Sequence, residues 1–436
     1  MAEFQHGRPM LKFAPSFRDC FTTLAHLGIS YVWIDTFCIL QGTSEDSRRD
    51  WEIESLVMEQ VYAHSVLNVC AAHGVDSTKG CFKQRRMTAQ MLRWRPLSAE
   101  AVRTFVLHSD DVIPRDMFNR HHLFTRAWVV QEMLLAPRSL HFGTDQIWWQ
   151  CLQKGLISEN DLHHPRSVPP GTVTLSSGLK EPILNPGILE THPDQLHKHW
   201  YRLMEKYTSC TLSQPNEDKL RAIQGIANRI ARSTDDDYVE GYLCKELPAA
   251  LCWVTYKGTP SPHHRAPSWS WASMDGPLFF AQRGGRDQKT NYSTLAAVVG
   301  TSVSCPGSRP RPNESPATVL QCVGRPIRVP QPVGFGGHLK PRLMSFTLWN
   351  TCFRTQLDAA TDESSAMDAT YSFLPILRHK ENLAGRTTRS LFGLVLEQGT
   401  DSLYVRRGAV PYPGVEMNES MMSHLCRVRP QFLRIR

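Results

Sequence analysis

The strongest constraint on the fold is a nearly continuous apolar run at residues 29–34 that ends in an aspartate. The run reads Ile-Ser-Tyr-Val-Trp-Ile and is followed at once by Asp35. Short apolar runs without alternation are typical of strands buried on both faces, as in parallel sheets covered by helices. We therefore expect a buried strand here, with Asp35 just past its carboxyl end, where ligands bind in open α/β sheets.

The segments on either side of this run fit an alternation of helices and strands. Apolar spacing predicts a helix from residue 17 to a capping glycine, Gly28, and a second helix after the polar turn at 41–46. A further apolar run at 65–72 predicts a second parallel strand, which gives a strand, helix, strand unit. On the second helix we expect a buried stripe consisting of Ile53, Leu56, Val57, Gln60 and Val61.

Composition and periodicity divide the rest of the chain. A short helix at 126–135, stopped by Pro137, precedes strands at 139–142 and 146–151. Residues 154–194 are rich in Pro, His, Ser and Gly without periodicity, which predicts a linker or long loop after a first domain at 1–153. We expect a helical segment at 195–280 and a β-rich region at 281–436, whose stretch 306–316 is disorder-prone.

Composition also limits the classes of function. No apolar run approaches the roughly 18 residues of a membrane span, and the N-terminus lacks a secretory signal, so we expect a cytoplasmic protein without an integral membrane segment. Twelve cysteines are then reduced thiols, and no Cys-x-x-Cys or His-Glu-x-x-His pattern predicts a metal site. The net charge of +8 is scattered, which argues against nucleic-acid binding, and glycine-rich phosphate loops are absent from the sequence.

Three polar residues stand in apolar surroundings and are candidates for chemistry. Asp35 could line a ligand crevice, or it could accept backbone hydrogen bonds in a turn. Cys38 could be a nucleophile beside a base, or a structural thiol. Glu132, within Trp-Val-Val-Gln-Glu-Met-Leu-Leu, is either an exposed helical glutamate or a carboxylate held for a purpose.

Tryptophans carry the remaining signals. Trp128 lies one turn before Glu132 on the same helix face and could either stack on a planar ligand or fill the core. Trp269 and Trp271 alternate in Pro267-Ser-Trp-Ser-Trp, so both rings are expected on one face. They could anchor a domain junction or form an exposed binding pair.

These blocks, in this order, resemble fungal heterokaryon-incompatibility (HET) domain proteins. Tyr31-Val-Trp-Ile-Asp-Thr-Phe-Cys-Ile-Leu-Gln41 is similar to the family's Tyr-x-Trp-Ile-Asp-x-x-Cys-Ile-x-Gln block, and Arg126-Ala-Trp-Val-Val-Gln-Glu132 to its third block. The similarity covers roughly residues 15–280. The family's opening Leu-Ser-Tyr-x-Trp-Gly strand has no counterpart before Tyr31, so we expect an N-terminally truncated domain that lacks this strand.

The resemblance implies a fold and an activity. The fold would be a TIR-like, flavodoxin-like α/β domain with a parallel sheet. The role would be non-self recognition and cell-death signalling, with NAD cleaved at the nicotinamide-ribose bond as a substrate and with no cofactor or metal. Glu132 would be catalytic, and Trp128, Asp35, Trp33 and Arg126 would bind the substrate. The alternative is a non-catalytic module that associates with itself or with an incompatibility partner protein, or an inactive truncated relative.

Overall fold

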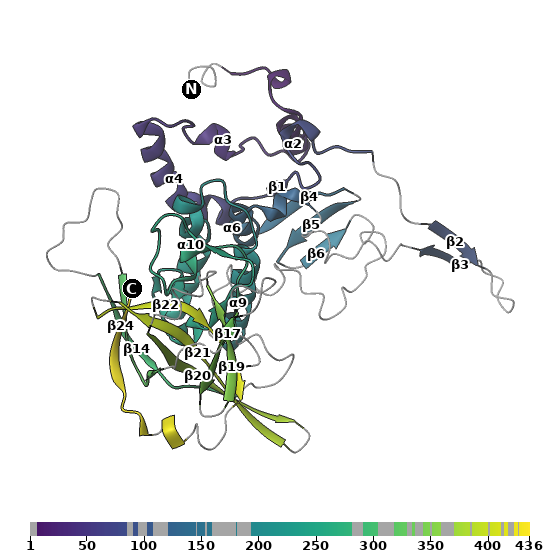
Figure 1. Ribbon diagram of the computed structural model, residues 1–436. Coiled ribbons are helices and arrows are strands. Elements are labelled where there is room, and N and C mark those ends of the chain that lie inside the picture. The colour runs from purple at the N-terminus through teal and green to yellow at the C-terminus, as the bar shows by residue number, and fades with distance from the viewer. Residues whose placement is uncertain are drawn as a thin grey trace. The chain divides into compact units, whose positions relative to one another are not determined.

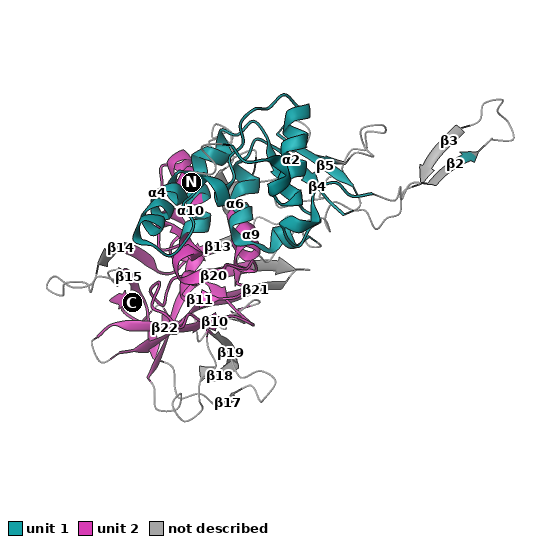
Figure 2. Cartoon of the chain, turned by 90° about the horizontal axis from the view of Figure 1, so that it is seen from above, with its two compact units in different colours: residues 1–191, 221–226 teal, residues 192–220, 227–436 magenta. Residues whose placement is uncertain are grey.

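The computed structural model forms two compact units. The first contains residues 1–191 together with 221–226, and the second contains residues 192–220 and 227–436 (Figure 2). The structure describes residues 7–84, 90–94, 103–107, 121–144, 146–152, 155–158, 180, 193–280, 291–303, 318–328, 334–335, 343–348, 351–358, 370–383, 386–399, 402–410, 414–416, 423–425 and 427–436. Most of the predicted linker at 154–194 and all of 306–316 lie outside these residues, and the domain boundaries at 153, 194 and 280 stay predictions.

The described residues of the first unit form four α-helices, three of which match helices predicted from the sequence (Figure 1). They are α2 (Pro15–His26), α3 (Asp35–Cys38), α4 (Glu45–Ala63) and α6 (Ala127–Leu135), and the 3-10 turns are η1 (Met10–Lys12), η2 (Ser77–Lys79) and η4 (His122–Thr125). Helix α2 is followed by Gly28 at a φ of 69°, which confirms the predicted glycine cap. The side chain of Ser44 caps α4 by accepting the N–H of Ser47 at 3.2 Å.

The sheet of the first unit is mixed rather than parallel. Its four described strands, in the order β1-β4-β5-β6, are β1 (Asn68–Cys70), β4 (Arg138–Phe142), β5 (Ile147–Cys151) and β6 (Gly155–Ser158). Only β1 and β4 run parallel, and the other two pairs are antiparallel. The predicted strands at 65–72, 139–142 and 146–151 are therefore present, whereas the flavodoxin-like parallel sheet is present only in part. A separate hairpin joins β2 (Gln90–Trp94) to β3 (Arg103–Leu107).

The strand predicted at residues 29–34 is wrong. This segment forms no strand, and Tyr31 and Val32 are 93% and 44% exposed. A strand is stable only when its backbone groups pair with a neighbour, and within the described residues the segment has no sheet partner. Its apolar side chains consequently lie at the surface, and Asp35 begins the short helix α3 instead of following a strand.

The predicted buried stripe of α4 is also wrong. Ile53 and Leu56 are 55% and 65% exposed, and Glu59, which is not part of that stripe, is buried. The face that α4 does bury consists of Ser47, Ser55, Met58 and Glu59. That face is set by the elements that pack on it, because α4 contacts α6 and Glu59 lies against residue 225. Packing partners from distant sequence thus override the local apolar pattern.

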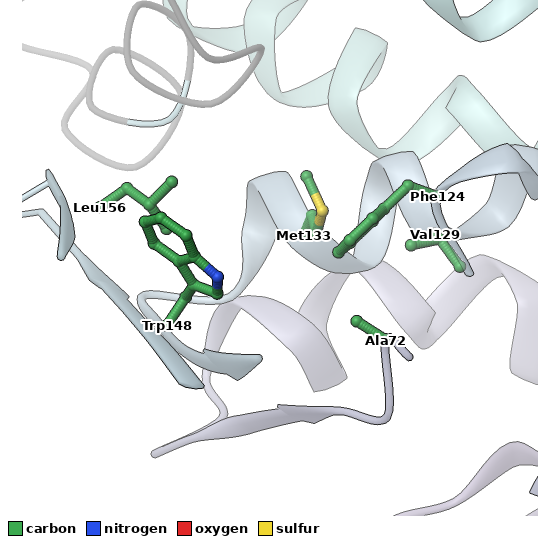
Figure 3. Packing of buried hydrophobic residues seen from close by; sticks show 6 residues of the cluster. All are labelled: Ala72, Phe124, Val129, Met133, Trp148 and Leu156. Carbon is green, nitrogen blue, oxygen red and sulfur yellow. The ribbon is translucent and has the colours of Figure 1, made fainter. Parts of the chain in front are cut away.

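Helix α6 packs against the sheet through a small apolar cluster. Val129 and Met133 of α6 pack with Trp148 of β5 and Leu156 of β6, and Phe124 and Ala72 complete the cluster (Figure 3). Each of these side chains is less than a tenth exposed. The site-bearing helix is therefore held on the sheet by burial of large side chains, each stabilising the fold by about 1.5–3 kcal/mol.

The second unit joins helices to a large, mainly antiparallel sheet. Its helices are α9 (Pro193–Thr208) and most of α10 (Pro215–Thr234), with 3-10 turns η5 (Cys244–Glu246), η6 (Ala249–Leu251) and η7 (Trp271–Ser273). Short pairs are β7 (Tyr238–Val239) with β8 (Tyr242–Leu243), β9 (Trp253–Val254) with β12 (Phe279–Phe280), and β10 (Thr259–Pro260) with β11 (Met274–Asp275).

Twelve of the described strands form the large sheet, which confirms the β-rich C-terminal region. They are β13 (Asn291–Thr294), β14 (Ala297–Val303), β15 (Thr318–Gly324), β16 (Ile327–Arg328), β17 (Gly334–Phe335), β18 (Leu343–Leu348), β19 (Thr351–Leu357), β20 (Tyr371–Leu383), β21 (Arg386–Gln398), β22 (Tyr404–Ala409), β23 (Val415–Glu416) and β24 (Gln431–Ile435). The long strands β20 and β21 pair along their whole length at its centre.

Trp269 and Trp271 are core residues of the second unit. Both rings are fully buried, so an exposed binding pair is excluded. The Trp271 indole donates to the Gly241 carbonyl at 2.8 Å, and the Trp269 ring stacks on Tyr242. Among the described helices, none is both long and apolar enough to span a bilayer.

Candidate functional site

Helix α6 is a buried support for the residues that it presents. Seven of its nine residues are buried, and Glu132 and Trp128 are partly exposed. The Asn68 side chain on β1 donates to the backbone carbonyl of Glu132 at 3.4 Å, and the Lys180 ammonium donates to the next carbonyl, that of Met133, at 2.9 Å. A cation at the last turn of a helix stabilises its free carbonyls. The turn that carries Glu132 is thereby fixed from two sides.

The Glu132 carboxyl group lies in an environment that favours its neutral form. Burial raises its pKa to about 7, while the nearby Arg126 charge lowers it, the Asp35 charge raises it, and a hydrogen bond from the Tyr62 side chain lowers it. Removal from water is the largest effect, and the cation and the phenol offset part of it. Glu132 is therefore close to half ionised at neutral pH, in the range expected for a group that works on a substrate near pH 7.

Two pairs of aromatic rings, called here the aromatic cluster, connect α4 to α6 and to residue 33. Trp128 of α6 meets Trp51 of α4 edge to face, with ring centroids 5.3 Å apart. Trp33 meets Tyr62 of α4 edge to face at 5.9 Å. All four rings are partly exposed, so the cluster reaches the surface. Aromatic faces and edges of this kind accept planar ligand rings.

Two charged residues lie at the exposed side of the cluster. Asp35 and Arg126 are both exposed, and both act electrostatically on Glu132. The Asp35 carboxylate also accepts the N–H and the hydroxyl of Thr36 at 2.7 and 3.1 Å, so the turn role predicted as the alternative is present. Arg126 precedes the first residue of α6. All five residues predicted from the sequence lie in the first unit. Asp35 and Arg126 act on Glu132, whereas Trp33 and Trp128 contact rings of α4.

Two members of the cluster were not predicted from the sequence. Trp51 and Tyr62, both on α4, provide the ring that meets Trp128 and the hydroxyl that donates to Glu132. A signal for them existed, because a spacing of eleven residues is about three helical turns and places both on one face. The apolar residues Ile53 and Leu56 predicted a different buried face for α4. Cys38 is exposed, and the nucleophile interpretation gains no support from a neighbouring base.

A polar layer lies on the sheet face beneath α6. His141 of β4 is fully buried, and its Nε2 lies 3.3 Å from the side-chain oxygen of Gln150 on β5. Burial lowers the pKa of His141 to about 3, so this imidazole is neutral in the folded protein. The layer therefore adds hydrogen-bonding groups without adding charge below the site.

The geometry supports chemistry in which positive charge develops on a bound ligand. A carboxylate held in a partly dry, aromatic setting attracts a cation more strongly than one in water, because the local dielectric is low. The hydrogen bond from Tyr62 favours the ionised form of that carboxyl group. The arrangement has no nucleophile activated by a base among the described residues, so Glu132 is the group on which a reaction would depend.

Comparison with known families agrees with the resemblance drawn from the sequence. Residues 3–132 match the family model described as heterokaryon incompatibility protein (HET). The matched segment contains all five predicted site residues, and its last residue is Glu132. No curated protein and no solved structure gave a match.

Proposed function

We propose that the unit carrying Glu132 cleaves NAD at the bond between nicotinamide and ribose, and that this reaction signals cell death in non-self recognition. The C1′–N bond breaks, and its electron pair neutralises the positively charged nicotinamide nitrogen. Water then forms the new bond to C1′ and loses a proton, which leaves ADP-ribose as the second product. Positive charge develops on the ribose as nicotinamide departs, so a carboxylate beside the sugar lowers the barrier.

The observation that carries this proposal is the combination of Glu132, its raised pKa and its hydrogen bond from Tyr62 within an aromatic cluster. The ionised form would stabilise the developing charge on the ribose. Trp128 and Trp33 would bind the flat nicotinamide or adenine ring. Arg126, exposed at the start of α6, would attract the diphosphate. Asp35, which is also exposed, would line the mouth of the site, where its negative charge would offset the positive charge of Arg126.

The test is release of nicotinamide by the purified chain, measured by chromatography. We expect Glu132→Gln to lower the rate by about 100-fold or more, as removal of one transition-state contact does in other enzymes. Glu52→Gln is the matched control, because Glu52 is an exposed glutamate on α4. Equal rates for the wild type and Glu132→Gln would refute the role of Glu132, and no release by the wild type would refute the reaction.

A second candidate function is supported by a separate observation. Three large apolar side chains of the first unit, Tyr31, Leu56 and Ile53, are 93%, 65% and 55% exposed. A non-catalytic association module would use such residues. Sedimentation over a range of concentrations tests it: assembly that is lost in Leu56→Asp, with no nicotinamide release by either protein, would favour the module over the enzyme.

A further inference from the structure

A hydrogen bond links the helix of the candidate site to a distant turn of the chain. The side-chain oxygen of Gln131 accepts the backbone N–H of Gly225 at 3.0 Å. Gln131 is 1% exposed and immediately precedes Glu132. Gly225 lies in the middle of α10, in the segment 221–226 that belongs to the first unit. In a regular helix this N–H points at the carbonyl four residues earlier. The Gln131 oxygen therefore accepts a hydrogen bond from an N–H in the interior of α10.

Only glycine fits at position 225. A Cβ there would lie 2.6 Å from the Gln131 side-chain oxygen and 2.9 Å from the Cβ of Glu59 on α4. Glycine in a helix interior costs about 1 kcal/mol relative to alanine. Its use here allows α4, α6 and α10 to approach closely at one point. Glu59 is one turn from Tyr62, and Gln131 adjoins Glu132, so this contact lies beside the Tyr62 to Glu132 hydrogen bond.

We propose that Gln131 and Gly225 are positioning residues for Glu132. The proposal rests on the proposed function only in calling the site catalytic. Gln131 is buried, and a buried amide left without its partner is destabilised, so loss of this hydrogen bond displaces Gln131 and the turn of α6 that adjoins it. Rotation of α6 then separates Glu132 from Tyr62.

The first test removes the hydrogen-bond acceptor and keeps the length of the side chain. We expect Gln131→Met to speed amide hydrogen exchange at 127–135 and to move the titration midpoint of Glu132 from about 7 toward 4.5, because the carboxyl group gains water. The midpoint is read from the difference between each protein and its Glu132→Gln form. Gln60→Met, at an exposed glutamine of α4, is the control. An unchanged midpoint in Gln131→Met would overturn the positioning role.

A second variant guards against simple loss of folding. Gly225→Ala raises helix propensity, so we expect α10 itself to keep its protection from exchange while α6 loses protection. With NAD as substrate, either variant should lower kcat by about 10- to 100-fold with little change in KM, since misplacement acts on the transition state. Gly225→Ala with wild-type exchange in α6 would contradict the proposed contact. These exchange results decide the inference even if the wild type releases no nicotinamide, which would refute only the proposed function.

Discussion

Glu132 and His141 should give the first unit two opposing pH dependences. Burial raises the pKa of Glu132 to about 7 and lowers that of His141 to about 3. Unfolding returns both groups to water, where their pKa values are 4.5 and 6.5. Between pH 4.5 and pH 6.5, unfolding therefore releases a proton from Glu132 and takes up a proton at His141. The two effects on the free energy of unfolding therefore cancel there in the wild type.

The magnitude follows from about 1.4 kcal/mol for each pH unit of difference. Glu132 contributes stability that is fully present below pH 4.5 and is lost as the pH rises through 7, a change of about 3 kcal/mol at most because the carboxyl group keeps some contact with solvent. His141 has the opposite sign. Its contribution is fully present above pH 6.5 and falls by about 5 kcal/mol as the pH approaches 3.

Substitution by glutamine separates the two effects. Glu132→Gln should gain stability relative to the wild type as the pH rises from 4.5 to 7, and His141→Gln should gain it as the pH falls from 6.5. The assay is urea-dependent amide exchange of peptides covering α6 and β4, because it reports opening of this unit rather than of the whole chain. Glu52→Gln serves as a control with a flat difference. If the stability of the wild type and of Glu132→Gln changed with pH in the same way, burial would not raise the pKa of the Glu132 carboxyl group.

Two further predictions concern packing in each unit. Arg406→Met should destabilise the second unit by about 3–5 kcal/mol in urea unfolding, since it leaves the buried Asp358 carboxylate without its ion pair. The control Arg407→Met, at an exposed pair, should cost less than about 1 kcal/mol. Equal losses of stability in the two variants would contradict this prediction. Asp19→Ala should cost about 1–3 kcal/mol in the first unit, because it leaves unpaired two loop N–H groups that follow Gly80, and an unchanged exchange rate in that loop would count against it.

The sequence was sufficient where structure depends on near neighbours. The spacing of Trp128 and Glu132 placed both on one face of α6, and both contact side chains of α4. Strands β4 and β5 follow from apolar runs around a turn, and α2 follows from its apolar spacing and Gly28. These signals act over a few residues, so no knowledge of the rest of the fold is needed.

Prediction from the sequence failed where the structure depends on contacts between residues that are far apart in the chain. The run at 29–34 has the composition of a buried strand, but a strand needs a neighbour for its backbone, and composition does not show whether one exists. On α4, two exposed apolar residues, Ile53 and Leu56, suggested the wrong face. The true face is set by α6 and by residue 225, which lies far along the chain. The polar character of that face, with Ser55 and Glu59 buried, gave no apolar signal to read.

The environment of Glu132 is therefore a property of the assembled unit and not of the family motif alone. The family match ends at Glu132, yet the next two groups that fix its helix come from beyond the match: Lys180 holds the Met133 carbonyl, and Gly225 holds Gln131. The strands β4, β5 and β6 beneath α6 also lie past the matched segment. Burial is the largest cause of the raised pKa, and these later segments support the helix that carries the carboxyl group. Two chains with identical Trp-to-Glu motifs can then differ in the ionisation of the glutamate, because Tyr62, Asp35 and the supports of α6 all lie outside that motif.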